Sequence, residues 1–112
     1  MNYLKNVNLD TSTADYIDEI NKRYSWWING NRHRIDGPAY IDEKKKIYAW
    51  CINGKSHRED GPSFIDLNNK EYCWYINGID KTKEITQWLT KNKIDWLFMT
   101  REQKVFIKIK WK

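Results

Sequence analysis

A unit of 24 residues occurs three times in succession between residues 14 and 85, and it constrains the fold more than any other feature of the chain. Self-similarity at a fixed period is the sequence signature of a repeat architecture. The residues that recur at this period are Tyr24, Tyr48 and Tyr72; Trp26, Trp50 and Trp74; Ile28, Ile52 and Ile76; and the Asn-Gly pairs that begin at Asn29, Asn53 and Asn77.

Each unit contains two short apolar runs joined by a polar link, as in residues 38–42 and 47–52 of the middle copy. Runs of this length, rich in β-branched and aromatic residues and bounded by turn residues, are typical of strands. We therefore predict a mainly β fold in which tandem hairpins form a meandering antiparallel sheet. The predicted strands cover residues 15–18, 23–28, 39–42, 47–52, 63–66 and 71–76.

Side chains alternate between the two faces of a strand, so the second strand of each unit divides into two sets. The set that contains the recurring Tyr, Trp and Ile is expected to form the core. The other set varies from copy to copy, and its members include Trp27, Cys51 and Tyr75. Because large aromatic side chains are good interface anchors, we take this variable set as the first candidate for a partner-binding surface.

The ends of the chain depart from the repeat. Residues 1–13 align with part of a unit and are compatible with a degenerate half-repeat that adds a strand. Residues 82–91 place apolar side chains at helical spacing, and a helix there would cover the open end of the array. Residues 105–112 alternate apolar side chains with lysine, which predicts a short terminal strand at a sheet edge. A capping-box pattern at residues 100–103 favours a helical ending as the alternative.

Positive charge is concentrated in the C-terminal part of this single 112-residue domain. Residues 1–80 contain 11 Lys and Arg against 12 Asp and Glu, whereas residues 81–112 contain nine against three. An acidic protein surface or a phosphate backbone would complement such a segment. The lysines expected to contact a partner are Lys104, Lys108, Lys110 and Lys112.

The histidines and aspartates do not form a recognisable catalytic or metal-binding pattern. Equivalent residues of consecutive hairpins lie two strands apart, about 9–10 Å at the usual spacing between strands. His33 and His57 would then be too far apart to share a zinc ion. Asp36 and Asp60 precede Gly-Pro turns, where an aspartate ordinarily accepts hydrogen bonds from the local backbone.

The remaining polar residues of these loops also favour a structural role. Arg34 and Arg58 are expected to be partly exposed. Cys51 and Cys73 occupy different positions of the unit, so a disulfide is not expected. No Gly-rich phosphate loop or nucleophile motif occurs. We therefore predict no catalytic residue, no metal ion and no cofactor, and a protein that is not an enzyme.

The unit resembles the MORN-type repeat, and it is most similar to the variant W-x-x-N-G-K-x-H-R-x-D-G-P-A. Residues 50–63 depart from this pattern only at Ser63, and residues 26–39 depart only at Asn31. The third copy keeps residues 74–78 and then loses the His-Arg-x-Asp-Gly-Pro part. The resemblance covers the repeats and implies hairpins that serve as interaction or assembly scaffolds, found in many phage, viral and bacterial proteins.

Taken together, these features predict a non-enzymatic protein-interaction module that contacts a partner through the variable face or a sheet edge. The resemblance implies a phage or viral accessory protein that binds or inhibits a host protein, such as a defence factor. Nucleic-acid binding through the basic tail and aromatic side chains is the alternative. No secretory signal or membrane-spanning run occurs, so we expect a cytoplasmic protein that does not bind membranes. An edge-mediated dimer is compatible with the sequence.

Overall fold

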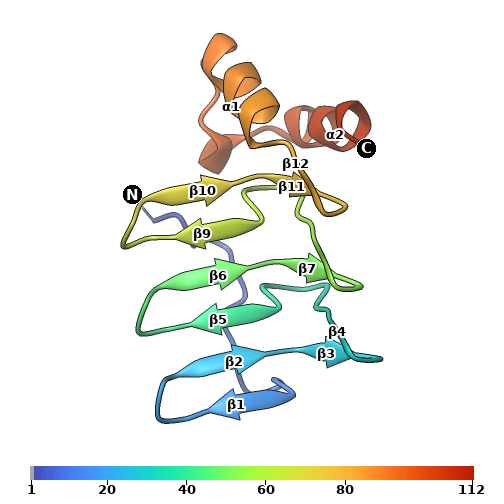
Figure 1. Cartoon of the computed structure of the whole chain (residues 1–112). Coiled ribbons are helices and arrows are strands. Elements are labelled where there is room, and N and C mark those ends of the chain that lie inside the picture. The colour runs from blue at the N-terminus through green and yellow to red at the C-terminus, as the bar shows by residue number, and fades with distance from the viewer. Residues whose placement is uncertain (1) are drawn as a thin grey trace.

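The computed structural model describes residues 2–112. Its centre is an antiparallel sheet in which strands follow one another in chain order (Figure 1). The six strands are β1 (Tyr16–Asp18), β2 (Arg23–Ser25), β5 (Tyr40–Asp42), β6 (Ile47–Ala49), β9 (Phe64–Asp66) and β10 (Glu71–Cys73). They form three hairpins of matching register, with Tyr16 opposite Ser25, Tyr40 opposite Ala49 and Phe64 opposite Cys73. The prediction of a mainly β fold built from antiparallel hairpins is confirmed.

Three smaller hairpins extend from this sheet: β3 (Trp27–Ile28) with β4 (Asn31–Arg32), β7 (Cys51–Ile52) with β8 (Lys55–Ser56), and β11 (Tyr75–Ile76) with β12 (Ile79–Asp80). The second strand predicted in each unit is therefore interrupted at a tryptophan. The Trp26 N–H donates to the Ala39 carbonyl at 3.0 Å, while the Trp26 carbonyl accepts from the His33 N–H at 2.9 Å. The chain thus changes pairing partners at this residue, which the strand pattern alone did not reveal.

The Asn-Gly pairs form the turns of the small hairpins. Asn29 and Gly30 both have positive φ, 51° and 78°, and the equivalent pairs in the other two copies have nearly the same values. Two consecutive residues with positive φ define the type I′ turn that suits a two-residue hairpin loop.

The core lies on one side of the six-stranded sheet, which we call the inner face. Its buried cluster consists of Tyr24, Trp26, Ile41, Tyr48, Trp50 and Ile65. Residues 2–13, which we call the N-terminal strap, pack Leu4 and Val7 against this cluster, and the Trp26 Nε1 donates to the Thr13 hydroxyl at 3.0 Å. The strap contains no strand within the described residues, so the suggested N-terminal strand is not present.

The C-terminal segment folds into α1 (Thr82–Lys91), a short 3₁₀ turn η1 (Trp96–Phe98) and α2 (Arg101–Lys110). The helix predicted over residues 82–91 is confirmed. Its Ile85 and Leu89 form a second buried cluster with Trp74 and Ile76 at the β10 end of the sheet (Figure 1). Within residues 2–112, no helix is long and apolar enough to cross a membrane.

The prediction of a short terminal strand over residues 105–112 is wrong, because most of this segment belongs to α2. The Gln103 N–H donates to the Thr100 hydroxyl at 3.2 Å, and the Thr100 N–H donates to the Gln103 side chain at 2.9 Å, which completes a capping box. Ile107 is fully buried whereas Ile109 is 70 % exposed, so the alternation did not reflect two sheet faces. The Phe106 ring stacks on Trp88 of α1 with 4.9 Å between centroids.

Candidate functional site

The His-Arg-x-Asp-Gly-Pro loops of the first two units are built around a buried arginine that lies on a tryptophan ring. Arg34 lies over Trp26 and Arg58 over Trp50, each with 3.9 Å from Cζ to the ring centroid. Both arginines are buried, so the prediction that they are partly exposed is wrong. Arg34 also donates to the Pro38 carbonyl at 3.2 Å, and Arg58 donates to the Pro62 carbonyl at 3.1 Å.

The glycine of each Asp-Gly-Pro turn provides the space that the arginine occupies. A Cβ atom built on Gly61 would lie 2.7 Å from the Arg58 Cζ, and one built on Gly37 would lie 3.0 Å from the Arg34 Cζ. Both distances are shorter than ordinary van der Waals contact. The requirement for glycine here is therefore steric.

The two aspartates of these turns bind the arginines. The Asp36 carboxylate accepts from the Arg34 Nε at 3.0 Å, and the Asp60 carboxylate accepts from the Arg58 Nε at 2.8 Å. The expected bonds to local backbone are replaced by these ion pairs. Burial lowers the pKa of the Arg58 guanidinium from its usual value, and the charge of Asp60 opposes this effect. The aspartates thus compensate buried positive charge.

The two histidines join neighbouring units. The Nδ1 atom of His33 accepts from the Asn53 N–H, and that of His57 accepts from the Asn77 N–H, both at 2.9 Å. Each imidazole therefore holds the turn of the following small hairpin. Within residues 2–112, no group of three or more His, Cys, Asp or Glu side chains is placed to hold a metal ion.

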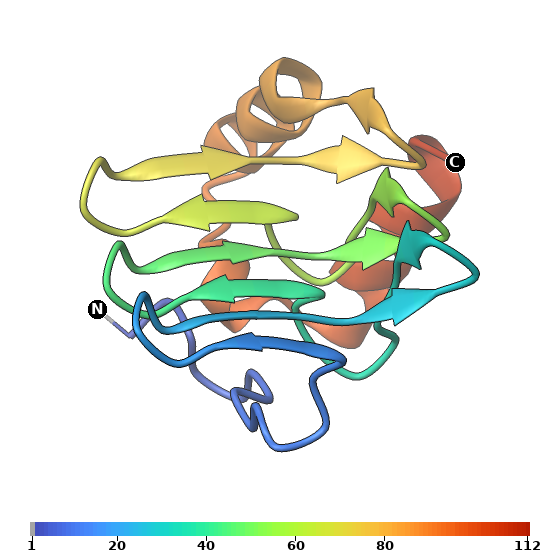
Figure 2. The same ribbon diagram turned by 60° about the horizontal axis from the view of Figure 1, so that its bottom comes forward.

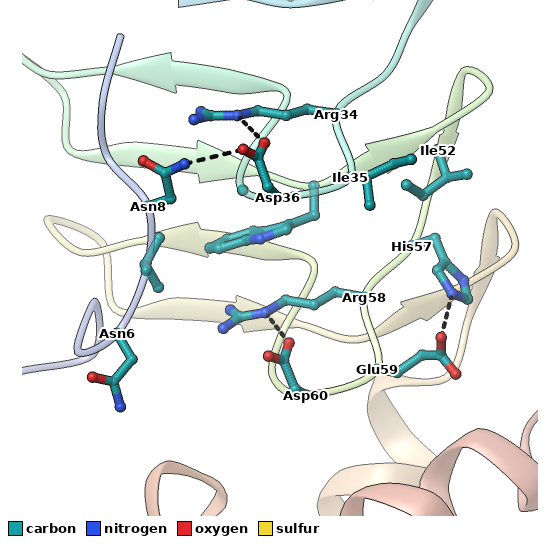
Figure 3. Close-up of a pocket in the computed structure, with 13 residues that line it drawn as sticks. Asn6, Asn8, Arg34, Ile35, Asp36, Ile52, His57, Arg58, Glu59 and Asp60 are labelled. Atoms are coloured by element: carbon teal, nitrogen blue, oxygen red, sulfur yellow. Dashed lines mark hydrogen bonds and ion pairs between the residues drawn. The ribbon is translucent and has the colours of Figure 1, made fainter.

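A hollow of about 530 Å³ lies between the N-terminal strap and these loops (Figure 3). Trp50 lines it, and Asp36 and Asp60 are its carboxylates nearest the two arginines. The His57 Nε2 lies 3.3 Å from a Glu59 oxygen. Among the described residues that line the hollow there is no Ser, Thr or Cys to act as a nucleophile. The Arg34–Asp36 and Arg58–Asp60 ion pairs at its wall hold the loops together.

We call the opposite side of the sheet the outer face. Among the described residues, it contributes none to the two buried clusters, whose sheet residues all belong to the inner face, where the strap and the helices also contribute. The outer face also has a row of aromatic side chains that sequence reasoning missed, namely Tyr16, Tyr40 and Phe64, which lie opposite the small residues Ser25, Ala49 and Cys73. The recurrence of an aromatic residue at this position of each unit was the signal that could have found them.

The structure places three predicted contact residues, Trp27, Cys51 and Tyr75, on separate small hairpins. Trp27 is 40 % exposed, and its indole Nε1 donates to the Ser25 hydroxyl at 2.7 Å. Cys51 is half-buried, and burial raises the pKa of its thiol. Tyr75 is half-buried too, and the charge of Asp80 raises the pKa of its hydroxyl. Both cysteines are free thiols.

Arg32 of β4 is a further residue of the outer face that the sequence did not single out. Its Cζ lies 4.6 Å from the Tyr40 ring centroid and 5.2 Å from that of Trp27. Its Nε is buried without a hydrogen-bond partner in the part of the chain that the structure describes. Together with Tyr16 these residues line a hollow of about 320 Å³. Arg32 was missed because its equivalents, Ser56 and Asp80, share no chemistry with it.

The predicted contact lysines, three in α2 and Lys112 just after it, lie apart from this face. Lys104, Lys108, Lys110 and Lys112 are all exposed. Lys104 and Lys108 line a hollow with Glu59 and Asp60, and Lys108 and Lys112 line another with His57 and Ile76. Neither hollow includes Trp27, so the structure does not bring the two predicted sets of contact residues together.

No family model, curated protein or solved structure matches this chain.

Proposed function

We propose that this chain is a non-enzymatic protein-binding module that contacts its partner with the outer face of the sheet. The supporting observation is the group formed by Tyr16, Trp27, Arg32 and Tyr40, of which Tyr16 is 57 % exposed. Exposed aromatic side chains gathered in one place are costly in water unless a partner covers them. Aromatic and arginine side chains are also the commonest anchors of protein interfaces.

The guanidinium of Arg32, a half-buried residue, indicates the chemistry of the partner. Arginine binds carboxylate oxygens through paired, charge-assisted hydrogen bonds, so an acidic side chain of the partner would complement it. An acidic partner would also be attracted by the exposed lysines of the C-terminal segment, which would raise the association rate more than the affinity. We further propose, on the resemblance of the repeat alone, that the partner is a protein of a host cell.

The proposal can be tested by capturing partners on the immobilised full chain from a lysate of a candidate host. Arg32→Ala and Tyr40→Ala should each lose the captured protein, whereas Ile35→Ala, an exposed aliphatic residue outside the outer-face group, should retain it. Retention by all three variants would contradict the proposal. Nucleic-acid binding would replace it if nuclease treatment or high salt abolished capture and only a Lys104, Lys108, Lys110 and Lys112 variant matched that loss.

A further inference from the structure

The two edge strands of the six-stranded sheet, β10 and β1, have different surroundings. At the β10 end, the Trp74 N–H donates to the Thr82 hydroxyl at 2.9 Å, and α1 lies over this end of the sheet (Figure 1). At the other end, β1 pairs only with β2, and its second edge has no strand partner among residues 2–112 (Figure 2). The backbone N–H and C=O groups along such an edge are a template for another strand.

The molecule contains two filled copies of this same edge. β2 occupies the corresponding edge of β5, where Tyr24 lies opposite Ile41, and β6 occupies that of β9, where Tyr48 lies opposite Ile65. Subtracting the 24-residue period from Ile41 gives Ile17 in the middle of β1. The three isoleucines therefore occupy equivalent positions. Ile41 and Ile65 have a neighbouring strand on both sides, whereas Ile17 has one on one side only.

The exposed fractions of the three isoleucines differ because β1 lacks a second neighbouring strand. Ile41 and Ile65 are 1 % and 0 % exposed, whereas Ile17 is 44 % exposed. A strand on the β1 edge would place a side chain beside Ile17 as Tyr24 lies beside Ile41, and would remove this apolar surface from water.

The filled edges specify which backbone atoms a new strand would bind. In β5 the bonds are Trp26 N–H to Ala39 C=O and Glu43 N–H to Lys22 C=O, both at 3.0 Å. Because hydrogen-bonded pairs alternate along antiparallel strands, Tyr24 and Ile41 form the pair between them. The equivalent atoms on β1 belong to Asp15, Ile17 and Glu19.

We infer that β1 accepts an extended segment of another protein as a seventh strand, with tyrosine opposite Ile17 and a small residue opposite Tyr16. The small residue follows from the filled edges, where Ser25 lies opposite Tyr40 and Ala49 opposite Phe64. This site consists of the β1 backbone and the side chains of Tyr16, Ile17 and Asp18. It shares Tyr16 with the outer-face group but includes none of Trp27, Arg32 and Tyr40, so Tyr40→Ala leaves it unchanged.

Charge favours a basic residue before that tyrosine. In the filled edge of β5, the Arg23 Nε donates to the Asp42 carboxylate at 3.2 Å, and Asp18 occupies the equivalent position on β1. A basic side chain opposite Asp18 would therefore be attracted to it.

The same reasoning disfavours a second copy of this chain. Its β10 would place Glu71 opposite Asp18, and it would have to displace α1. Two β1 strands paired about Ile17 would place Asp15 opposite Glu19. Both arrangements put like charges directly across from each other, which destabilises strand pairing.

The probe for this site is the capped peptide Asn-Lys-Arg-Tyr-Ser-Trp, which copies residues 21–26. Added to the ¹⁵N-labelled full chain, it should bind saturably and shift the amide signals of residues 15–19. The same peptide with an N-methyl group on its tyrosine cannot donate the central hydrogen bond, so it should bind about tenfold or more weakly. A peptide with glutamate in place of the arginine should also bind more weakly.

A protein variant gives the reciprocal test. Ile17→Pro removes the N–H that faces the empty edge, at an edge strand where proline is tolerated. Provided that its spectrum shows a folded sheet, it should lose peptide binding, whereas Tyr40→Ala should keep it.

Three results would overturn the inference. They are equal affinity of the N-methylated peptide, no binding of the parent peptide at millimolar concentration, and a concentration-dependent dimer of the full chain that Ile17→Pro abolishes. The last result would assign the edge to a second copy. Because Tyr40→Ala tests the outer face and Ile17→Pro tests the edge, failure of one proposal is distinguishable from failure of the other.

Discussion

The guanidinium of Arg58 lies on the indole ring of Trp50, with 3.9 Å between Cζ and the ring centroid, and the backbone of Gly61 closes the other side. The arrangement repeats at Arg34, Trp26 and Gly37, which lie 24 residues earlier. It explains why the arginine and the glycine of the His-Arg-x-Asp-Gly-Pro loop occur together. Glycine has no side chain, and the arginine guanidinium fills the space that a side chain at that position would need.

We expect Arg58→Ala to lower the free energy of unfolding by about 2–4 kcal/mol. It removes a desolvated cation–π contact and hydrogen bonds to Asp60 and to the Pro62 carbonyl. Arg58→Lys should recover only part of the loss, because an ammonium lacks the planar fork. Urea denaturation measures the change, and the exposed Arg101→Ala provides the control. An Arg58→Ala variant as stable as the parent would show that the stacking contributes nothing.

Gly61→Ala should destabilise the fold by about 1–3 kcal/mol, because the new methyl group overlaps the Arg58 guanidinium. The cost should be smaller when Arg58 is already alanine, so the double-mutant cycle should show strong coupling. Gly30→Ala is a useful comparison. No atom lies within 4 Å of its added Cβ, so any cost there comes from the positive φ of 78° and should not depend on Arg58.

Trp50→Ala should cost about 3–5 kcal/mol, the usual range for removing a large buried aromatic side chain. Trp50 is buried in the inner-face cluster and also supports Arg58. The thermal midpoint should therefore fall sharply, whereas Trp27→Ala on the outer face should change it little. If Trp50→Ala melted like the parent, the assignment of the inner face as core would be wrong.

Thr100→Ala should destabilise α2 by about 1 kcal/mol, because the hydroxyl that accepts from the Gln103 N–H is lost. Amide hydrogen exchange should accelerate first in residues 101–104. Thr90→Ala, within α1, removes a hydroxyl of the same kind outside the cap and serves as control. Equal exchange in both variants would contradict the role of the capping box.

Acidification should destabilise the fold below about pH 4. The side chain and backbone N–H of Asn69 hold the pKa of Asp66 below its ordinary 3.8, and those of Asn21 do the same for Asp18. A carboxyl with a depressed pKa in the folded state stabilises it fully above the unfolded pKa, and this contribution is lost as the pH falls through the folded value. Urea midpoints from pH 5 downward measure the effect. Asp66→Asn should flatten the decline, and an unchanged slope would contradict the assignment.

Several elements followed from the sequence alone because their causes are local. Short apolar runs with β-branched and aromatic residues form the strands of the sheet, Asn-Gly pairs take positive φ, and apolar residues at helical spacing in 82–91 form α1. The burial of Trp26, Trp50 and Trp74 agrees with the predicted alternation of side chains about a strand, whereas Ile28, which the same alternation assigned to the core, is 52 % exposed. Each of these depends on residues within a few positions of one another.

Tertiary structure decided the features that depend on contacts between distant segments. Alternation in residues 105–112 fits a strand, but the contact of Phe106 with Trp88 and the burial of Ile107 favour a helix. Arg34 is buried because its guanidinium meets a ring eight positions earlier and the Asp10 carbonyl of the strap, at 3.1 Å. A charged side chain can be removed from water only where such partners converge, and a sequence pattern does not show where they converge.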